Sequence, residues 1–242
     1  MPRMEREHDM EDVAKVLNVW NSSLCRKVDV GGLISRNATA HKWKATYRSL
    51  VLRELTFWRV TDLLNQMVTL SATGHVLGAR ILLRSTIETL GILIYLNQKT
   101  RAVLDGEETF NAFSDITSQL MLGSKNKSTK LTAINVTHTV LEKWCERKYP
   151  GIFELYSNLC ESAHPNYDGV CHGYSYVNEK DYETIFKNRW CELYAENLGE
   201  LTLTFMTVFE HEYNTVWPEQ FDELEKWLQA NDKRLESERT DI

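Results

Sequence analysis

The feature that most constrains the fold is a long apolar segment at residues 74–96, GHVLGARILLRSTIETLGILIYL, which is hydrophobic on nearly every side of a helix. Its length would suit a membrane span, but Arg80, Arg84 and Glu88 lie in its middle. A charge at the centre of a bilayer costs about 2.5 to 3.5 kcal/mol on insertion scales, and nothing in the segment offsets three of them. The segment therefore predicts the central helix of a bundle and no contact with a membrane.

Helical periodicity continues through most of the chain. Four prolines and eleven glycines in 242 residues leave few breakers, which favours long helices over many short strands. We predict an all-α fold: an antiparallel helical bundle with additional N- and C-terminal helices, as a single domain over 1–242. Its expected parts are an N-terminal extension at about 1–35, a bundle at about 45–215 and a C-terminal helix at about 217–236.

The apolar spacing also predicts where the helices begin and end. Helices are expected at 9–20, 36–70, 75–98, 107–122, 131–147, 151–163 and 179–216. Strand signals are confined to 173–178. Trp217 and Pro218 are expected to end the long helix before a last helix starts, since proline suits a first helical turn. The charged tail after Asn231 is expected to fray.

Net charge and cysteine content limit the partners and the compartment. The chain has a net charge of -6 and a pI of about 5.7. Its overall charge therefore does not indicate a nucleic-acid partner, although a local basic site remains possible. Five cysteines at irregular spacing are expected to be reduced thiols. The first residues carry charges but no apolar core, so we expect no signal peptide and a cytoplasmic location.

A stripe of charge crosses the apolar segment. Arg80, Arg84 and Glu88 are spaced four residues apart, which places them on one face of a helix. Charges on so apolar a helix must be paired or must face a cleft, because an unpaired buried charge is costly. One interpretation is an internal Arg84–Glu88 ion pair that sets the register of the helices. The other is a functional cleft lined by two guanidinium groups and a carboxylate.

A second polar cluster, ESAHPNYDG at residues 161–169, ends the helix predicted before it. Pro165 lacks an amide donor and disfavours helical angles at His164, and Asn166 is a turn former. A histidine at a helix end most often bonds a carbonyl or a cap. Because the side chains of both clusters need polar partners, we predict that Arg84, Glu88 and His164 lie together, with Asn166 at the rim.

Two motifs together carry a resemblance to a known family. The first is R-S-x-x-E and the second is Y-x-x-L-x-E-x-A-H-P-N. Their residues are Arg84, Ser85 and Glu88, then Tyr156, Leu159, Glu161, Ala163, His164, Pro165 and Asn166. The pair resembles the HEPN superfamily (higher eukaryote and prokaryote nucleotide-binding helical bundles), and is closer to its divergent bacterial branches, many of unknown function. The resemblance covers roughly residues 45–215.

The resemblance implies a metal-independent ribonuclease or toxin-like effector, as in toxin–antitoxin and antiviral phage-defence systems. In that chemistry His164 would transfer protons and Arg84 would stabilise charge on the phosphate. Glu88 would orient Arg84, while Arg80 and Asn166 would contribute to binding. RNA or a nucleotide is the implied ligand, with a homodimer and a protein partner or antitoxin. The chain departs from the family pattern where Asn158 stands in the place expected for an arginine.

A weaker candidate pair is Arg36 and His41, in RNATAH, which has the family's spacing but precedes the predicted bundle helices. A zinc site is not predicted, because the cysteines and histidines show no paired ligands at short spacing. No phosphate-binding glycine loop is present. The sequence therefore predicts neither a metal nor a cofactor.

The alternative is a non-catalytic helical module that binds a nucleotide, a nucleic acid or a protein. In that case Arg80, Arg84, Glu88 and His164 would form a buried polar network. Solvent access separates the two hypotheses: an open groove at His164 favours the ribonuclease, and a closed hydrogen-bonded cluster favours the binding module.

Overall fold

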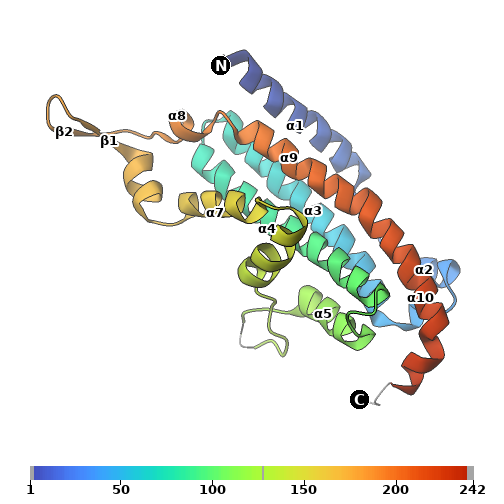
Figure 1. The fold of residues 1–242 in the computed structure, drawn as a ribbon. Helices are drawn as coiled ribbons and strands as arrows, with labels where there is room; N and C mark the ends of the chain where they lie inside the picture. Colours follow the sequence, from blue (N-terminus) through green and yellow to red (C-terminus); the bar gives the residue numbers. More distant parts are fainter. Residues whose placement is uncertain (1–2, 127, 239–242) are drawn as a thin grey trace. The chain divides into compact units, whose positions relative to one another are not determined.

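The computed structural model describes residues 3–126 and 128–238, and these are mostly helical (Figure 1). In chain order the elements are α1 (Arg3–Ser23), α2 (Val30–Arg36), η1 (Ala40–Lys42), α3 (Lys44–Ala72), α4 (Val76–Leu104), α5 (Phe110–Leu122), η2 (Val136–Cys145), α6 (Glu146–Lys148), α7 (Ile152–Ala163), η3 (Tyr167–His172), β1 (Ser175–Asn178), β2 (Glu183–Phe186), α8 (Trp190–Tyr194), α9 (Leu198–His211), η4 (Glu212–Val216) and α10 (Trp217–Ser237). The predicted all-α bundle is confirmed. In the described ranges, no helix combines the length and the hydrophobicity that crossing a bilayer requires.

The helices group into two compact units, each built from three separate segments of the chain. The first unit contains the described residues up to Leu24, then Phe57–Leu90 and Cys145–Val208. The second unit contains Cys25–Thr56, Gly91–Trp144 and the described residues from Phe209 onward. The single domain predicted over 1–242 stays a prediction.

The first unit packs apolar faces of α1, α3, α4 and α7 around a common core. The core-facing residues of α1 are Val13, Leu17 and Trp20, which recur at helical spacing and are buried. The buried residues of the other three helices in this unit include Val60, Leu64, Met67, Leu83, Ile87, Tyr156 and Leu159. The stretch of α4 in this unit thus has one face in the core, which leaves another face for the charged stripe.

The second unit has an aromatic core. Trp43 meets Phe110 edge to face at 5.5 Å between ring centroids, and Trp217 stacks on Phe221 at 4.4 Å. Asp232 of α10 accepts a hydrogen bond from Trp43 Nε1 at 3.1 Å and forms an ion pair with Lys42. These contacts fix α10 to η1 within this unit.

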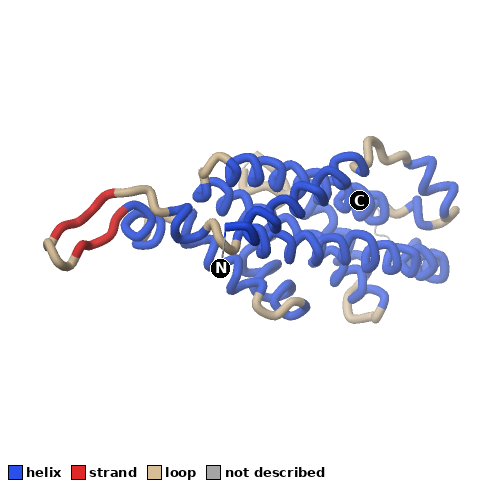
Figure 2. The backbone as a smooth tube through the Cα atoms, turned by 90° about the horizontal axis from the view of Figure 1, so that it is seen from above, coloured by secondary structure: helices blue, strands red, loops and turns tan. Residues whose placement is uncertain are grey.

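The prediction of one helix over 179–216 is wrong. The chain forms an antiparallel β1–β2 hairpin, with Ser175 opposite Phe186, and α9 begins only at Leu198. Figure 2 shows the two strands extending away from the helices around them. A turn held by the Asn178 side chain, which bonds Asp181 at 2.7 Å, favours the hairpin over a helix here. The strand signal at 173–178 is confirmed by β1, but the second strand lies beyond this range, at Glu183–Phe186.

Two expectations about the C-terminal part are also wrong. Trp217 and Pro218 do not end a helix, because Val216 already has helical angles and Pro218 lies in the first turn of α10. The prediction of a last helix with Pro218 in its first turn is confirmed, because α10 runs from Trp217 to Ser237. The tail after Asn231 does not fray at once, because Leu235 is buried and α10 continues to Ser237.

Candidate functional site

Arg84 and Glu88 of α4 form a closed network with two residues of α7. The guanidinium Nη2 of Arg84 lies 3.1 Å from Glu88 Oε1 and donates to the Tyr156 hydroxyl at 3.0 Å. The same hydroxyl donates to Glu88 Oε1 at 2.8 Å, and Arg84 Nε donates to Cys160 Sγ at 3.1 Å. Arg84 therefore has its Nε and one Nη group engaged by protein atoms.

The spacing within each helix explains this match. Arg84 and Glu88 are one turn apart on α4, and Tyr156 and Cys160 are one turn apart on α7. Burial of Arg84 lowers its pKa, but its hydrogen bonds to Tyr156 and Cys160 and the charge of Glu88 outweigh the burial, so the pKa lies above its ordinary value. The network supports the interpretation of the stripe as an Arg84–Glu88 ion pair within α4 that is hydrogen-bonded to α7.

Arg80 lies one turn earlier on α4 and has a different environment. Its Nε donates to Ser162 Oγ at 2.7 Å, its Nη2 donates to the Asn158 carbonyl at 3.2 Å, and its guanidinium carbon lies 4.1 Å from the ring centroid of Tyr194. Burial lowers the pKa of Arg80. No carboxylate of the described residues forms an ion pair with it, so its positive charge has no direct counter-charge within ion-pair distance.

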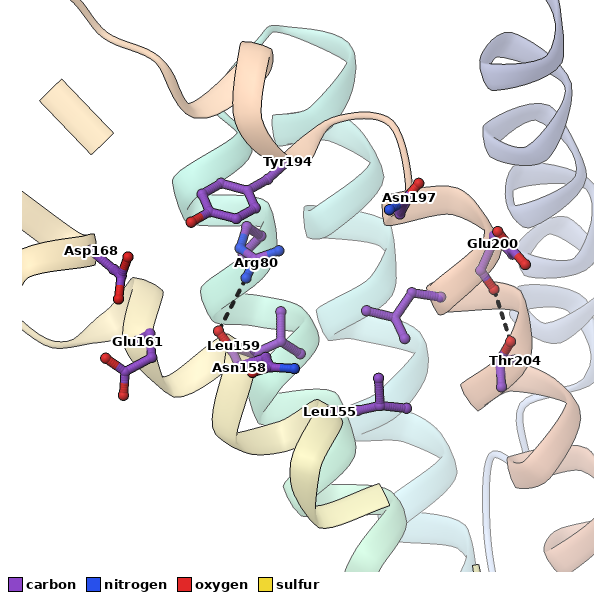
Figure 3. A pocket seen from close by; sticks show the side chains of 11 residues that line it. Arg80, Leu155, Asn158, Leu159, Glu161, Asp168, Tyr194, Asn197, Glu200 and Thr204 are labelled. Carbon is purple, nitrogen blue, oxygen red and sulfur yellow. Dashed lines mark hydrogen bonds between the residues drawn. The ribbon is translucent and has the colours of Figure 1, made fainter. Parts of the chain in front are cut away.

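Arg80 lines a pocket of about 610 Å³ in the first unit (Figure 3). We call it the Arg80 pocket, and its walls come from α4, α7, η3, α8, α9 and the residue before α9. Its lining residues are Arg80, Leu155, Asn158, Leu159, Glu161, Asp168, Tyr194, Asn197, Glu200, Leu201 and Thr204. Figure 3 shows Glu161 and Asp168 on one side of Arg80, and Glu200 with Thr204 on the α9 side.

His164 is not part of the Arg84 network. It is the C-cap residue of α7, its backbone amide donates to the Cys160 carbonyl at 3.1 Å, and its side chain is exposed. Among the described residues, its ring makes no hydrogen bond or ion pair with Arg84 or Glu88. The structure thus brings Arg84 and Glu88 together but leaves His164 in solvent, one turn beyond Cys160.

Asn166 has a capping role in the structure. Its side chain accepts a hydrogen bond from Gly169 N at 2.9 Å, which caps the start of η3, and donates to the carboxylate of Glu161. Through Glu161 it contacts the wall of the Arg80 pocket. The predicted position of Asn166 at the rim of the Arg84–Glu88–His164 cluster is therefore wrong, because its side chain contacts Glu161 and Gly169.

The weaker pair, Arg36 and His41, lies in the second unit. Arg36 forms ion pairs with Asp222 and with Glu225, the latter at 3.0 Å, and lies 5.7 Å over the ring of Phe221. His41 Nδ1 is 3.3 Å from the carbonyl of Asn37. Arg36 binds α10 and is not directed at His41, so the structure gives this pair a structural role.

Several pocket residues were not predicted as site residues, notably Glu161, Asp168, Tyr194 and Glu200. Only the fold brings them together, because they lie on different elements. Tyr156 and Cys160 could have been found, because their spacing repeats that of Arg84 and Glu88. Within the part of the chain that the structure describes, no group of three or more histidine, cysteine, aspartate or glutamate residues is arranged to hold a metal ion.

Comparison with known proteins adds no relative: the chain matches no protein-family model, no curated protein and no solved structure. The likeness to HEPN proteins rests on the two sequence motifs alone.

Proposed function

We propose that the protein is a helical binding module, and that the Arg80 pocket holds a small molecule with one anionic group. The observation that carries the proposal is the charge of Arg80, which is partly buried, oriented by Ser162 and Asn158, and in no ion pair with a described carboxylate. A partly buried charge normally has a counter-charge. An anionic ligand group would supply it and would meet a guanidinium that is already held in place.

The rest of the pocket wall limits the charge of the ligand. Glu161, Asp168 and Glu200 also line the pocket, so the carboxylates outnumber the arginine. A polyanion such as an RNA backbone would be repelled by these carboxylates. A ligand with a single negative group and several hydrogen-bond donors fits both features, because its donors would face the carboxylates and the amide groups of Asn158 and Asn197.

Binding can be tested with a panel of small anions that includes acetate, benzoate, methyl phosphate and adenosine monophosphate. We expect at least one of them to raise the melting temperature of the wild-type protein, because a ligand that binds only the folded state stabilises it. Arg80→Gln should weaken that binding about tenfold or more, since hydrogen bonds to a charged group contribute about 1.5 to 3 kcal/mol. The matched control is Arg59→Gln, which removes an arginine that donates to the Thr89 hydroxyl at 3.2 Å and does not line the pocket. No stabilisation by any anion, or equal binding by Arg80→Gln, would refute the proposal.

A second candidate is the metal-independent ribonuclease implied by the HEPN resemblance. The observation in its favour is the exposure of His164, which follows the Cys160–Arg84 contact by one helical turn and is accessible to a substrate. In this proposal His164 transfers the proton, while Arg84, oriented by Glu88 and Tyr156, faces the phosphate. Because Nε and one Nη group of Arg84 already contact protein atoms, its other Nη group would be the one to meet the phosphate.

The ribonuclease is tested by incubating varied RNAs with the purified protein in EDTA, with wild type beside His164→Ala. Cleavage by the wild type that disappears in His164→Ala would support it, and His172→Ala provides a matched control on the following element. Equal cleavage by wild type and His164→Ala, or none by either, would refute the ribonuclease and leave the binding module as the remaining proposal.

The proposal includes a homodimer, a protein partner and a cytoplasmic location. A homodimer is supported by exposed apolar side chains on the β1–β2 hairpin, above all Tyr182 and Phe186, and a protein partner or antitoxin would use the same kind of surface. A cytoplasmic location is supported by the cysteines of the described residues, none of which is in a disulfide.

A further inference from the structure

A second pocket of about 580 Å³ adjoins the Arg80 pocket in the first unit. Its lining residues are Lys148, Tyr149, Pro150, Gly151, Ile152, Glu154, Leu155, Asn158, Thr204, Phe205 and Val208. Leu155, Asn158 and Thr204 line both pockets, so the two form one groove between α7 and the part of α9 that belongs to this unit. We call the second half the tail groove.

The two halves of the groove differ in character. The Arg80 pocket contains four charged side chains and two asparagines. The tail groove is lined mainly by apolar and aromatic side chains, and its only charged residues are Lys148 and Glu154. Leu155 stands where the halves meet and keeps 36% of its surface exposed. A large apolar side chain in that position favours an apolar ligand segment next to the charged end.

The length of the groove sets the size of that segment. Ile152 in the tail groove and Glu161 in the Arg80 pocket are nine residues apart on α7. With a rise of 1.5 Å per residue, this separation corresponds to about 14 Å along the helix axis. The groove is therefore long enough for an extended chain of carbon atoms and longer than a small polar metabolite requires.

We propose that the ligand is an amphipathic monoacid, with its acidic head at Arg80 and an unbranched apolar chain in the tail groove. The inference rests on the proposed binding function and specifies the ligand of the same site. Arg80 favours this direction of binding, because its guanidinium is held by Ser162 and Asn158 and forms no ion pair with a described carboxylate. Lys148, the cation of the tail groove, lies over the ring of Tyr149 at 5.7 Å. The hydrophobic effect then holds the chain between α7 and α9, where Leu155 and Val208 are accessible to it.

The proposal is tested by calorimetry with acetate, hexanoate, octanoate and dodecanoate, each below its micellar concentration. Affinity should rise about fourfold for each added methylene group that is buried, and should level off once the chain exceeds the groove. Dodecyltrimethylammonium has the same chain with a positive head, and it should bind at least tenfold more weakly than dodecanoate. An affinity that does not depend on chain length, or no preference for the acidic head, overturns the inference.

Two variants separate the tail from the head. Val208→Asp places a charge in the tail groove and should weaken dodecanoate at least tenfold, while Thr207→Asp, the neighbouring exposed position outside the lining, should not. Equal loss in both variants, or none in either, would contradict a chain in the groove.

Arg80→Gln distinguishes failure of the amphipathic ligand from failure of the proposed binding function. If anions from the small panel bind in an Arg80-dependent way but show no response to chain length or to Val208→Asp, only the amphipathic ligand is refuted. If no anion binding depends on Arg80, the proposed function fails and this inference fails with it.

Discussion

At the residue scale, the Tyr156 hydroxyl is the centre of the Arg84 network. It accepts from the guanidinium at 3.0 Å and donates to Glu88 at 2.8 Å, so one oxygen joins both charged groups. The Arg84–Glu88 pair is also direct, at 3.1 Å, but both side chains keep about a quarter of their surface in solvent, 25% and 29%. A partly exposed ion pair contributes little by itself. The hydroxyl and its neighbours therefore carry much of the specificity of this contact.

We predict that Tyr156→Phe destabilises the protein by about 1 to 3 kcal/mol, because Arg84 and Glu88 each lose a hydrogen bond that water replaces incompletely. Urea unfolding measures the change. Tyr182→Phe, at a position that is 94% exposed, is the matched control and should leave stability unchanged. A loss no larger than that of the control would show that the network contributes no stability.

At the element scale, the connection from α7 to η3 depends on a close backbone approach. A Cβ atom at Gly169 would lie 1.9 Å from the carbonyl oxygen of His164, which no adjustment of a side chain can relieve. The backbone of Gly169 also donates to Asn166, which sets the start of η3. Glycine is therefore required where the chain turns beside the Arg80 pocket.

Gly169→Ala should cost about 1 to 3 kcal/mol or more, as overpacking does, and should move Asp168 in the pocket wall. Thermal unfolding measures the stability. Gly32→Ala, in α2, is the control: a Cβ there meets nothing within 4 Å, so this change should be neutral or slightly stabilising. Equal melting temperatures for the two variants would argue against a tight turn at Gly169.

The start of α7 provides a prediction about pH. Glu146 accepts hydrogen bonds from the backbone amides of Gly151 at 2.8 Å and Phe153 at 2.9 Å, and these bonds lower its pKa. A carboxylate with a lowered folded-state pKa contributes stability above its unfolded pKa of about 4.3, and this contribution is lost as the pH falls through the folded-state value.

We therefore expect Glu146→Gln to have a lower urea midpoint than wild type at pH 7, and the difference to shrink as the pH falls below about 4. The matched variant is Glu142→Gln, one turn earlier and exposed. A difference between Glu146→Gln and wild type that is constant over pH 3–7 would contradict the role of the charge.

At the scale of the whole molecule, the β1–β2 hairpin is the most exposed apolar feature of the described residues. Tyr182 is 94% exposed and Phe186 is 83% exposed, on a hairpin of two short strands with open edges. An isolated pair of strands is marginally stable in water and gains from a further partner. A second copy of the chain is the partner that the predicted homodimer requires.

Sedimentation at micromolar concentration should give twice the 28.2 kDa mass of the chain. Phe186→Glu should return the protein to a monomer, because a charge on the hairpin would have to be buried on association. Leu122→Glu, at a position that is 56% exposed in α5, should not. A wild-type mass of 28.2 kDa would contradict the homodimer.

The features that the sequence determined by itself are mostly those that depend on helical periodicity. The apolar stripe of α4, the helical face of Val13, Leu17 and Trp20, and the pairing of Arg84 with Glu88 all follow from residues three or four positions apart, which local helix geometry places together. An error of element type lies at 179–216, where hairpin turn contacts such as Asn178 with Asp181 compete with a helical pattern.

The candidate site was decided by the tertiary structure. Arg80 and Tyr194 are distant in sequence, and no periodicity relates them to Glu200 on α9. His164 was expected beside Arg84 because both are polar, but the cap at the end of α7 leaves it in solvent. Burial depends on which helices pack together, and that packing is a property of long-range contacts that a local pattern does not encode.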